Sequence, residues 1–162
     1  MKGIHIFLFL ILFFLSIDTY CQEINRRKVV YAELLGSAVT GSVNYDFRFK
    51  PGNDGFGMRT GLGFVPKALI IPIELNRLTG KNRIAFEYGA GVSAAIFLEE
   101  VGYDQTFLND LGNFGFIGYA KAGIRLTPKD NGVFFNLNWN PIINTVETRW
   151  VWFGLGIGYS WN

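Results

Sequence analysis

A strict two-residue alternation of apolar and polar side chains is the feature of this sequence that most constrains its fold. It is clearest across residues 42–49. The apolar positions there are Val43, Tyr45, Phe47 and Phe49, and the polar positions are Ser42, Asn44, Asp46 and Arg48. Because successive side chains of a β-strand point to opposite faces, this pattern predicts a strand with one apolar and one polar face. A shift of one residue would invert both faces, so the register is strongly specified.

The same alternation recurs throughout the chain after Gln22, without the 3.6-residue period of an amphipathic helix. It predicts eight strands, near residues 30–34, 42–49, 58–64, 71–76, 84–93, 116–126, 135–140 and 151–161. The chain also combines 20 glycines with 16 phenylalanines. Glycine costs about 1 kcal/mol at a helical position, whereas a barrel wall with one crowded and one cramped face can use both residue types. We therefore predict an all-β fold, an eight-stranded antiparallel up-and-down barrel.

The connections between the predicted strands fall into two classes. Compact turn sequences occupy residues 51–55, 79–82 and 128–132, and an up-and-down order places all three at one end of the barrel. The other end carries residues 36–41, 65–68, 98–113 and 142–148. Short periplasmic turns and longer external loops are typical of membrane barrels, so we expect both termini on the periplasmic side.

The N-terminal segment has the organisation of a secretory signal peptide. Lys2 provides a positive charge, residues 4–15 are almost entirely Ile, Leu and Phe, and Cys21 is a small residue suited to the position before cleavage. We therefore assign residues 1–21 to a cleaved, helical signal peptide and residues 22–162 to the barrel domain. Lipidation of Cys21 is the alternative to cleavage after it.

Cleavage after Cys21 would remove the chain's only cysteine together with His5, its only histidine. Disulfides, thiol chemistry and the usual zinc sites are then excluded from the mature chain. The general base of lipases, proteases and acyltransferases is most often His. Glu74 and Glu87, on neighbouring predicted strands, are the nearest pair of acids, and the bases near them favour a structural role. We expect no enzymatic activity, no metal and no cofactor.

Periodicity alone leaves open which face points outward, and the alternative is a soluble lipocalin-like barrel with an apolar interior. The interior of an eight-stranded barrel is just wide enough to be filled by side chains, so a face dense in large aromatic rings would overpack it. The polar face is rich in Gly and Ser, which suits a narrow lumen. Aromatic residues near the strand ends are typical of the interfacial girdles of membrane barrels. These residues are Phe47, Phe49, Phe64, Phe135, Trp139, Trp150, Tyr159 and Trp161. We predict a transmembrane barrel whose apolar face contacts lipid.

Pro72 is the one residue that conflicts with a closed barrel. It lies inside the fourth predicted strand, and proline lacks the N–H that a strand ladder requires. We expect weak ladder pairing at this position, with or without a β-bulge.

The alternating strands and the C-terminal segment 154–162 resemble those of the small outer-membrane β-barrels of Gram-negative bacteria, the OmpA/OmpX type. Segments 31–34, 43–46 and 118–130 also look like a widespread family of uncharacterised barrels. In such barrels the last strand is a signal for membrane insertion. The resemblance therefore implies an outer-membrane location and recognition by the barrel-assembly machinery. The matching positions are Gly156, Tyr159 and Trp161.

The polar face of the predicted strands carries four acids and four bases, so the lumen is neutral overall. They are Glu33, Asp46, Arg48, Arg59, Glu74, Glu87, Lys121 and Arg125. Neighbouring strands allow the pairs Glu33–Arg48, Asp46–Arg59, Arg59–Glu74, and Glu87 with Lys121 or Arg125. Since an unpaired buried charge costs several kcal/mol, we predict a structural salt-bridge network that plugs the barrel. An ion-conducting or gated lumen is the functional alternative.

The long connection at residues 98–113 is the candidate interaction site outside the lumen. It carries acidic and aromatic side chains and no base, and the residues selected are Glu99, Glu100, Tyr103, Asp104, Phe107 and Asp110. A contact site for an unknown extracellular partner, a mobile solvated loop and a weak divalent-cation site are all compatible with this composition. The carboxylate spacing does not follow that of an EF-hand.

The overall charge narrows the function classes further. A net charge of +2 is too small to favour nucleic-acid binding. The short basic run at residues 26–28 is interpreted as a solvated terminus. We expect an outer-membrane barrel with a structural or surface-interaction role and lipid as its surroundings. The alternatives are a narrow pore for ions or small solutes and, further off, a soluble ligand-binding barrel or a lipid-acting enzyme.

Overall fold

The computed structural model describes residues 26–66, 68–80, 82–98, 114–143 and 148–162. It contains the strands β1 (Lys28–Leu35), β2 (Gly41–Arg48), β3 (Gly55–Val65), β4 (Ala68–Thr79), β5 (Ile84–Phe97), β6 (Phe114–Leu126), β7 (Gly132–Trp139), β8 (Ile142–Ile143) and β9 (Phe153–Trp161). A short 3₁₀ helix, η2 (Gly36–Ala38), joins β1 to β2. No helix in the described residues is long and apolar enough to cross a membrane. The predicted signal peptide and the six candidate residues of the long connection lie outside the described residues.

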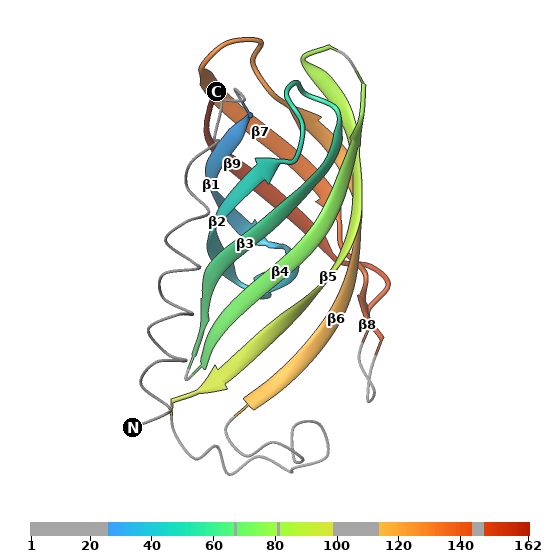
Figure 1. Cartoon of the computed structure of the whole chain (residues 1–162). Coiled ribbons are helices and arrows are strands. Elements are labelled where there is room, and N and C mark those ends of the chain that lie inside the picture. Colours follow the sequence, from blue (N-terminus) through green and yellow to red (C-terminus); the bar gives the residue numbers. More distant parts are fainter. Residues whose placement is uncertain (1–25, 67, 81, 99–113, 144–147) are drawn as a thin grey trace, which may run out of the picture.

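The strands form one closed antiparallel sheet (Figure 1). Strands β1 to β7 pair consecutively, β7 also pairs with β9, and the pairing of β9 with β1 closes the sheet. Strand β8 continues β7 in the same register, because β6 pairs Ala122 with Trp139 and Tyr119 with Ile142. The described chain is therefore an eight-stranded barrel in which β7 is interrupted at residues 140–141. The predicted fold class is confirmed.

The connections divide the barrel into two ends. The three compact turns join β2 to β3, β4 to β5, and β6 to β7 at one end, here called the turn end, as predicted. Gly52 and Gly55 have φ values of 103° and 86° in the first of these turns, a conformation that residues with a Cβ rarely adopt. Arg26 and Asn162 both lie at the turn end, since Lys28 pairs with Trp161. The opposite end is called the loop end.

The outer face of the sheet is apolar and the inner face is polar, as the sequence predicts. Outward apolar side chains are well exposed, for example 66% for Leu34, 61% for Phe64 and 56% for Leu155. Inward charged side chains are fully enclosed, with 1% exposure for Glu33 and 0% for Arg59. The prediction that the apolar face points outward is confirmed, and the alternative of an apolar interior is wrong.

Pro72 interrupts the ladder between β3 and β4 without shifting its register. The ladder between β3 and β4 pairs Thr60 with Ile73 and Gly63 with Ile70, and no pairing joins the positions between them. The register is the same on both sides of this gap, so the strand contains no bulge there. On its other side Pro72 keeps its place opposite Ser93 of β5. The expectation of weak pairing at Pro72 is confirmed.

The connection between β1 and β2 folds into the mouth of the barrel at the loop end. All residues of η2 are buried, and it contacts β2, β3, β4 and β9. The residues that flank it, Leu35 and Val39, have φ values of 60° and 70°. Left-handed backbone is costly for residues with a Cβ, above all a β-branched one, so surrounding contacts must hold this segment in place.

Candidate functional site

The inward-facing charges form one continuous chain of ion pairs in which acids and bases alternate. Its order is Glu33, Arg59, Glu74, Lys121, Glu87, Arg125, Asp46 and Arg48. The two contacts of the Lys121 ammonium, with Glu74 and Glu87, are both 3.4 Å long. The structure thus brings together all eight lumen residues selected from the sequence, and each is in contact with at least one opposite charge.

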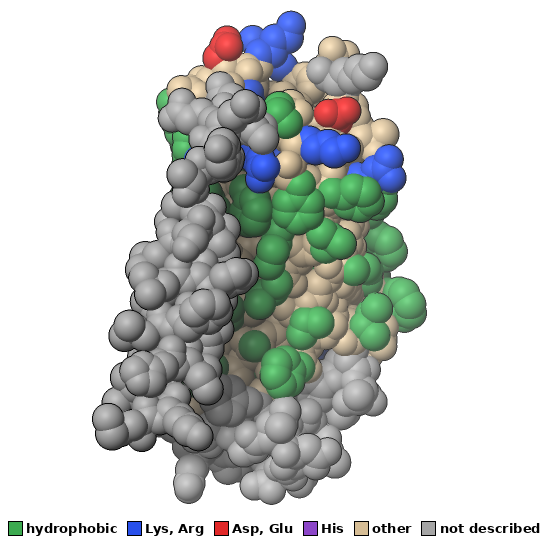
Figure 2. Space-filling view, viewed as in Figure 1, with side chains coloured by type: hydrophobic (Ala, Val, Ile, Leu, Met, Phe, Trp, Pro, Cys, Tyr) green, Lys and Arg blue, Asp and Glu red, His purple; other side chains and the backbone are tan. Residues whose placement is uncertain are grey.

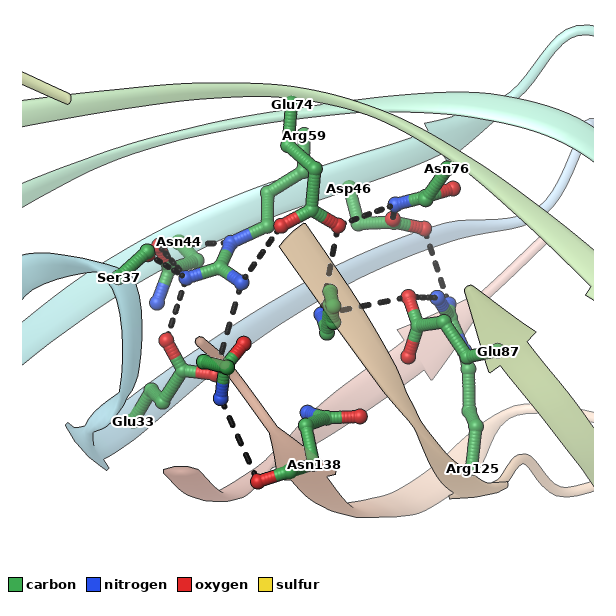
Figure 3. Close-up of polar contacts among 12 residues, drawn as sticks. Glu33, Ser37, Asn44, Asp46, Arg59, Glu74, Asn76, Glu87, Arg125 and Asn138 are labelled. Carbon is green, nitrogen blue, oxygen red and sulfur yellow. Dashed lines mark hydrogen bonds and ion pairs between the residues drawn. The ribbon is translucent and has the colours of Figure 1, made fainter. Parts of the chain in front are cut away.

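Asn76 turns part of this chain into a ring across the barrel (Figure 3). Its amide nitrogen donates to Asp46 Oδ2 at 2.8 Å and to Glu74 Oε1 at 3.2 Å. Asp46 in turn accepts from Arg125 Nη2 at 2.9 Å. The ring joins side chains of β2, β4, β5 and β6, so acids and bases from four strands are linked by direct contacts inside the lumen.

Arg59 is the residue with the most partners at the loop-end side of the network. Its guanidinium donates to both acids beside it, Glu33 and Glu74, and to Ser37 Oγ of η2 at 2.8 Å. Asn44 Oδ1 accepts two further hydrogen bonds, at 3.1 and 3.0 Å. The guanidinium carbon also lies 5.4 Å from the ring centroid of Tyr31, within cation–π range. A guanidinium with this many partners is the arrangement that a buried charge requires.

Two predicted ion pairs are wrong, and the sheet register explains both. Glu33 lies opposite Ser42, and the distance along β2 from Ser42 to Arg48 is about 20 Å at ~3.3 Å per residue. Asp46 and Arg59 are register partners, but Arg59 extends past Asn44 to Glu33. The predicted pairs of Arg59 with Glu74, and of Glu87 with both Lys121 and Arg125, are present.

Arg27 was expected in a solvated terminus, and that expectation is wrong. It continues the inward face of β1 and is only 4% exposed. Its guanidinium donates to the backbone carbonyls of Pro128, Lys129 and Asp130, at distances from 2.5 to 3.0 Å, and to Ser160 Oγ at 3.2 Å. Burial and the positive charge of Arg125 lower the pKa of Arg27 below its ordinary value. Arg27 thus ties the start of β1 to the turn between β6 and β7.

Two apolar clusters lie in the lumen beside the charge network. At the turn end Val29, Tyr31 and Phe134 pack together, with ring centroids of Tyr31 and Phe134 5.0 Å apart. The Arg125 guanidinium lies 4.7 Å from the Phe134 centroid. At the loop end a second cluster is built on Ala38, Ile70 and Ala95, with Val39, Val65 and Phe97 against it.

The remaining part of the lumen, here called the amide wall, is lined by β7 and β9 and carries no charge. Its residues are Asn136, Asn138 and Asn140 of β7 and the segment after it, and Gly154, Gly156, Gly158 and Ser160 of β9. The three asparagines are at most 2% exposed, yet both amide atoms of Asn136 and of Asn138 lack a hydrogen-bond partner, as does Asn140 Oδ1. Buried polar atoms of this kind are normally satisfied by water.

Sequence reasoning missed several of these lumen residues. Asn44 and Asn76 stand at inward positions of the alternation, so the sequence predicts that they face the lumen. It does not predict that they bridge the charged side chains. Ser37 lies in a connection, where periodicity carries no information about direction. Phe134 is an aromatic residue at an inward position, which the rule that apolar residues face outward does not anticipate.

The residues predicted as an insertion signal all lie on β9. Tyr159 is 52% exposed on the outer surface, Trp161 faces the same side, and Gly156 is buried on the lumen side. Outward aromatic rings form contacts near the turn end, such as Tyr45 with Phe47 at 5.9 Å and Tyr45 with Trp161 at 6.4 Å. Within the described part of the chain, no group of three or more His, Cys, Asp or Glu side chains is placed to hold a metal ion.

No family model and no curated protein matches the chain. Among solved structures it is similar to the crystal structure of the N-terminal β-barrel domain of Pseudomonas aeruginosa OprF. The sequence identity is 10%, the TM-score is 0.54, and the similarity covers 85% of this chain and 98% of that chain. This chain has the same barrel fold. The resemblance to OmpA-type barrels predicted from the sequence is therefore confirmed at the level of fold.

Proposed function

We propose that this protein is an integral outer-membrane barrel with a plugged lumen and a structural or surface-interaction role. The observation that carries the proposal is the inverted distribution of polarity. Large apolar side chains cover the outside of a closed sheet, while the acids and bases of the lumen network are enclosed and paired. In water this arrangement would be unstable, because exposed apolar surface costs ~25 cal/mol per Å². In lipid it is favourable, since closure of the barrel removes the unpaired edges that an open sheet would expose to hydrocarbon.

Location and topology follow from the same proposal. The barrel would be delivered by its signal peptide and inserted by the barrel-assembly machinery, with Gly156, Tyr159 and Trp161 of β9 as the recognised segment. The turn end would face the periplasm together with both termini. The loop end would then present the long connection, including the acidic and aromatic residues at 99–110, to an extracellular partner.

The plugged lumen is supported by the ring of contacts that Asn76 completes and by the apolar clusters that occupy lumen positions beside it. Opening a continuous path would separate ion pairs in an interior of low dielectric, where an unpaired charge costs several kcal/mol. Each lumen acid also has a base as partner, which argues against general acid–base catalysis. We therefore expect neither ion conduction nor enzymatic activity.

A narrow pore is the second candidate, and one observation favours it. The unpaired amide atoms of the amide wall would be solvated by a file of water molecules beside the charge network. Planar-bilayer recording separates the two candidates. We expect no discrete conductance from the wild-type protein, and steady unitary currents would contradict the plug and support the pore.

Membrane insertion is tested by heat-modifiable migration in gel electrophoresis. A folded membrane barrel resists detergent and migrates differently before and after boiling. We expect such a shift for protein extracted from the outer-membrane fraction. Recovery in the soluble periplasmic fraction, with one migration position under both conditions, would contradict the proposal.

A further inference from the structure

Lys28 occupies an aromatic setting on the outer surface at the turn end. It is exposed, and its register partners are Phe47 of β2 on one side and Trp161 of β9 on the other. Register partners project from the same face of a sheet with Cβ atoms about 5 Å apart. Tyr45, one step closer to the barrel centre, contacts both of these rings, with centroid distances of 5.9 and 6.4 Å. Lys28 therefore stands beside a group of three contacting aromatic residues, Tyr45, Phe47 and Trp161, at the turn end.

Arg77 repeats this arrangement on the neighbouring side of the barrel. It is an exposed residue of β4 whose register partners are Phe56 of β3 and Tyr88 of β5. The guanidinium carbon lies 5.1 Å from the Phe56 ring centroid. Tyr88 contacts Phe86, with centroids 6.0 Å apart. Two exposed cations at the turn end thus share one design, a base with an aromatic partner on each adjacent strand.

The exposed charges of the described residues are concentrated at this same end (Figure 2). The exposed bases there are Arg26, Lys28, Lys50, Arg77, Arg83 and Lys129, and the exposed acids are Asp54 and Asp130. At the loop end the described residues include a single exposed charged side chain, that of Arg149. The turn end therefore has an excess of positive charge directly beside the apolar belt.

We propose that Lys28 and Arg77 each bind the phosphate of an anionic phospholipid headgroup in the membrane leaflet at the turn end. The proposal rests on the membrane insertion proposed above. Aromatic rings hold the glycerol and upper acyl region of a lipid, while the cation beside them meets the phosphate. Arginine binds phosphate through a fork of two N–H groups and lysine through a compact charge. A Lys or Arg side chain near an anionic membrane surface increases the affinity for that surface by a factor of roughly five.

Trp161 makes the Lys28 site directly measurable. The other three tryptophans, Trp139, Trp150 and Trp152, lie at the loop end, so replacing them with Phe leaves one reporter beside Lys28. This protein is reconstituted with phosphatidylcholine or phosphatidylglycerol carrying bromine on the acyl chains, and the quenching in mixtures gives the relative affinity of the two lipids. We expect about a fivefold preference for phosphatidylglycerol, falling to near unity in Lys28→Gln.

Lys50→Gln is the matched control, because it removes the same charge from the same end without an aromatic partner in a strand ladder. It should keep the preference, and an equal loss in both variants would show a diffuse charge effect and overturn the proposal. A preference abolished by inorganic phosphate, but not by chloride at equal ionic strength, would assign the site to free phosphate instead. Equal quenching by both lipids in the single-tryptophan protein that retains Lys28 would overturn the lipid site alone. Absence of quenching by either lipid would contradict membrane insertion itself.

Native mass spectrometry of the detergent-solubilised wild-type protein with added phosphatidylglycerol tests the Arg77 site. Arg77→Gln should lose one retained lipid while leaving the preference reported by Trp161 unchanged. Retention of the full complement by Arg77→Gln would contradict the Arg77 site.

Discussion

The two walls of the lumen accommodate buried polar groups in opposite ways. On the wall formed by β1 to β6, each of the eight network charges has an oppositely charged partner, and Asn44 and Asn76 add hydrogen bonds, while Glu87 Oε2 and Tyr119 Oη have no hydrogen-bond partner. The amide wall has neutral asparagines with unpaired atoms, and glycine at most inward positions of β9. Ion pairs and hydrogen bonds therefore hold the side chains of the β1–β6 wall, whereas the amide wall consists mainly of small or unpaired side chains.

The difference follows from the fixed width of an eight-stranded barrel. The interior of such a barrel is just wide enough to be filled by side chains. Long Arg and Lys side chains on one wall therefore require small residues on the opposite wall. A Cβ at Gly156 would lie 2.1 Å from Asn136 Oδ1 and 2.9 Å from a ring carbon of Tyr31. Glycine on β9 thus provides the volume that the charged network and its aromatic neighbours occupy.

The largest effect on stability is expected from removing Arg59 from the wall formed by β1 to β6. Arg59→Leu leaves Glu33 without its bridging base and removes one base from Glu74, so it should lower the free energy of unfolding by about 3–5 kcal/mol. Urea titration of the refolded barrel in lipid vesicles measures this. The exposed Lys50→Gln serves as control and should change stability by less than ~0.5 kcal/mol. A loss for Arg59→Leu as small as that of the control would show that the network adds little to stability.

A smaller loss is expected from adding bulk to the amide wall. In Gly158→Ala the new methyl group would lie 2.1 Å from the Val30 carbonyl oxygen and 2.5 Å from Tyr31 Cα, so β1 and β9 would have to separate. Overpacking of this kind costs about 1–3 kcal/mol. Gly118→Ala is the matched control, because its nearest atom, the Ile143 carbonyl oxygen, is 3.4 Å away. Equal unfolding midpoints for the two variants would refute the explanation by close packing.

The finest test compares one asparagine from each wall. Asn76→Leu removes the bridge between Asp46 and Glu74 and should cost about 1–3 kcal/mol, because charged acceptors lose a donor. Asn138→Leu removes an amide whose side-chain atoms have no partner, so its effect should stay within ~1 kcal/mol. A costlier loss at Asn138 than at Asn76 would reverse the comparison and indicate ordered water on the amide wall.

Much of the architecture could be predicted from the sequence, because successive side chains of a strand alternate between its two faces. The alternation predicted the strands and the eight inward charges, the turn residues located the three turns, and the missing N–H of Pro72 located the weak pairing. Partner choice was less accessible. A strand neighbour is a fair guess for short side chains, but Arg59 and Arg125 are long enough to reach past a neighbouring strand or across the lumen.

The sequence by itself determined which side chains face inward and which face outward, since that depends only on the two-residue period of the backbone and on burial. Only the tertiary structure decided how the alternating charges connect into one chain, and that η2 folds into the loop-end mouth. It also decided that Arg27 binds the carbonyls of the turn between β6 and β7. These contacts depend on the register between strands distant in sequence and on the narrow width of the closed barrel, neither of which a local pattern records.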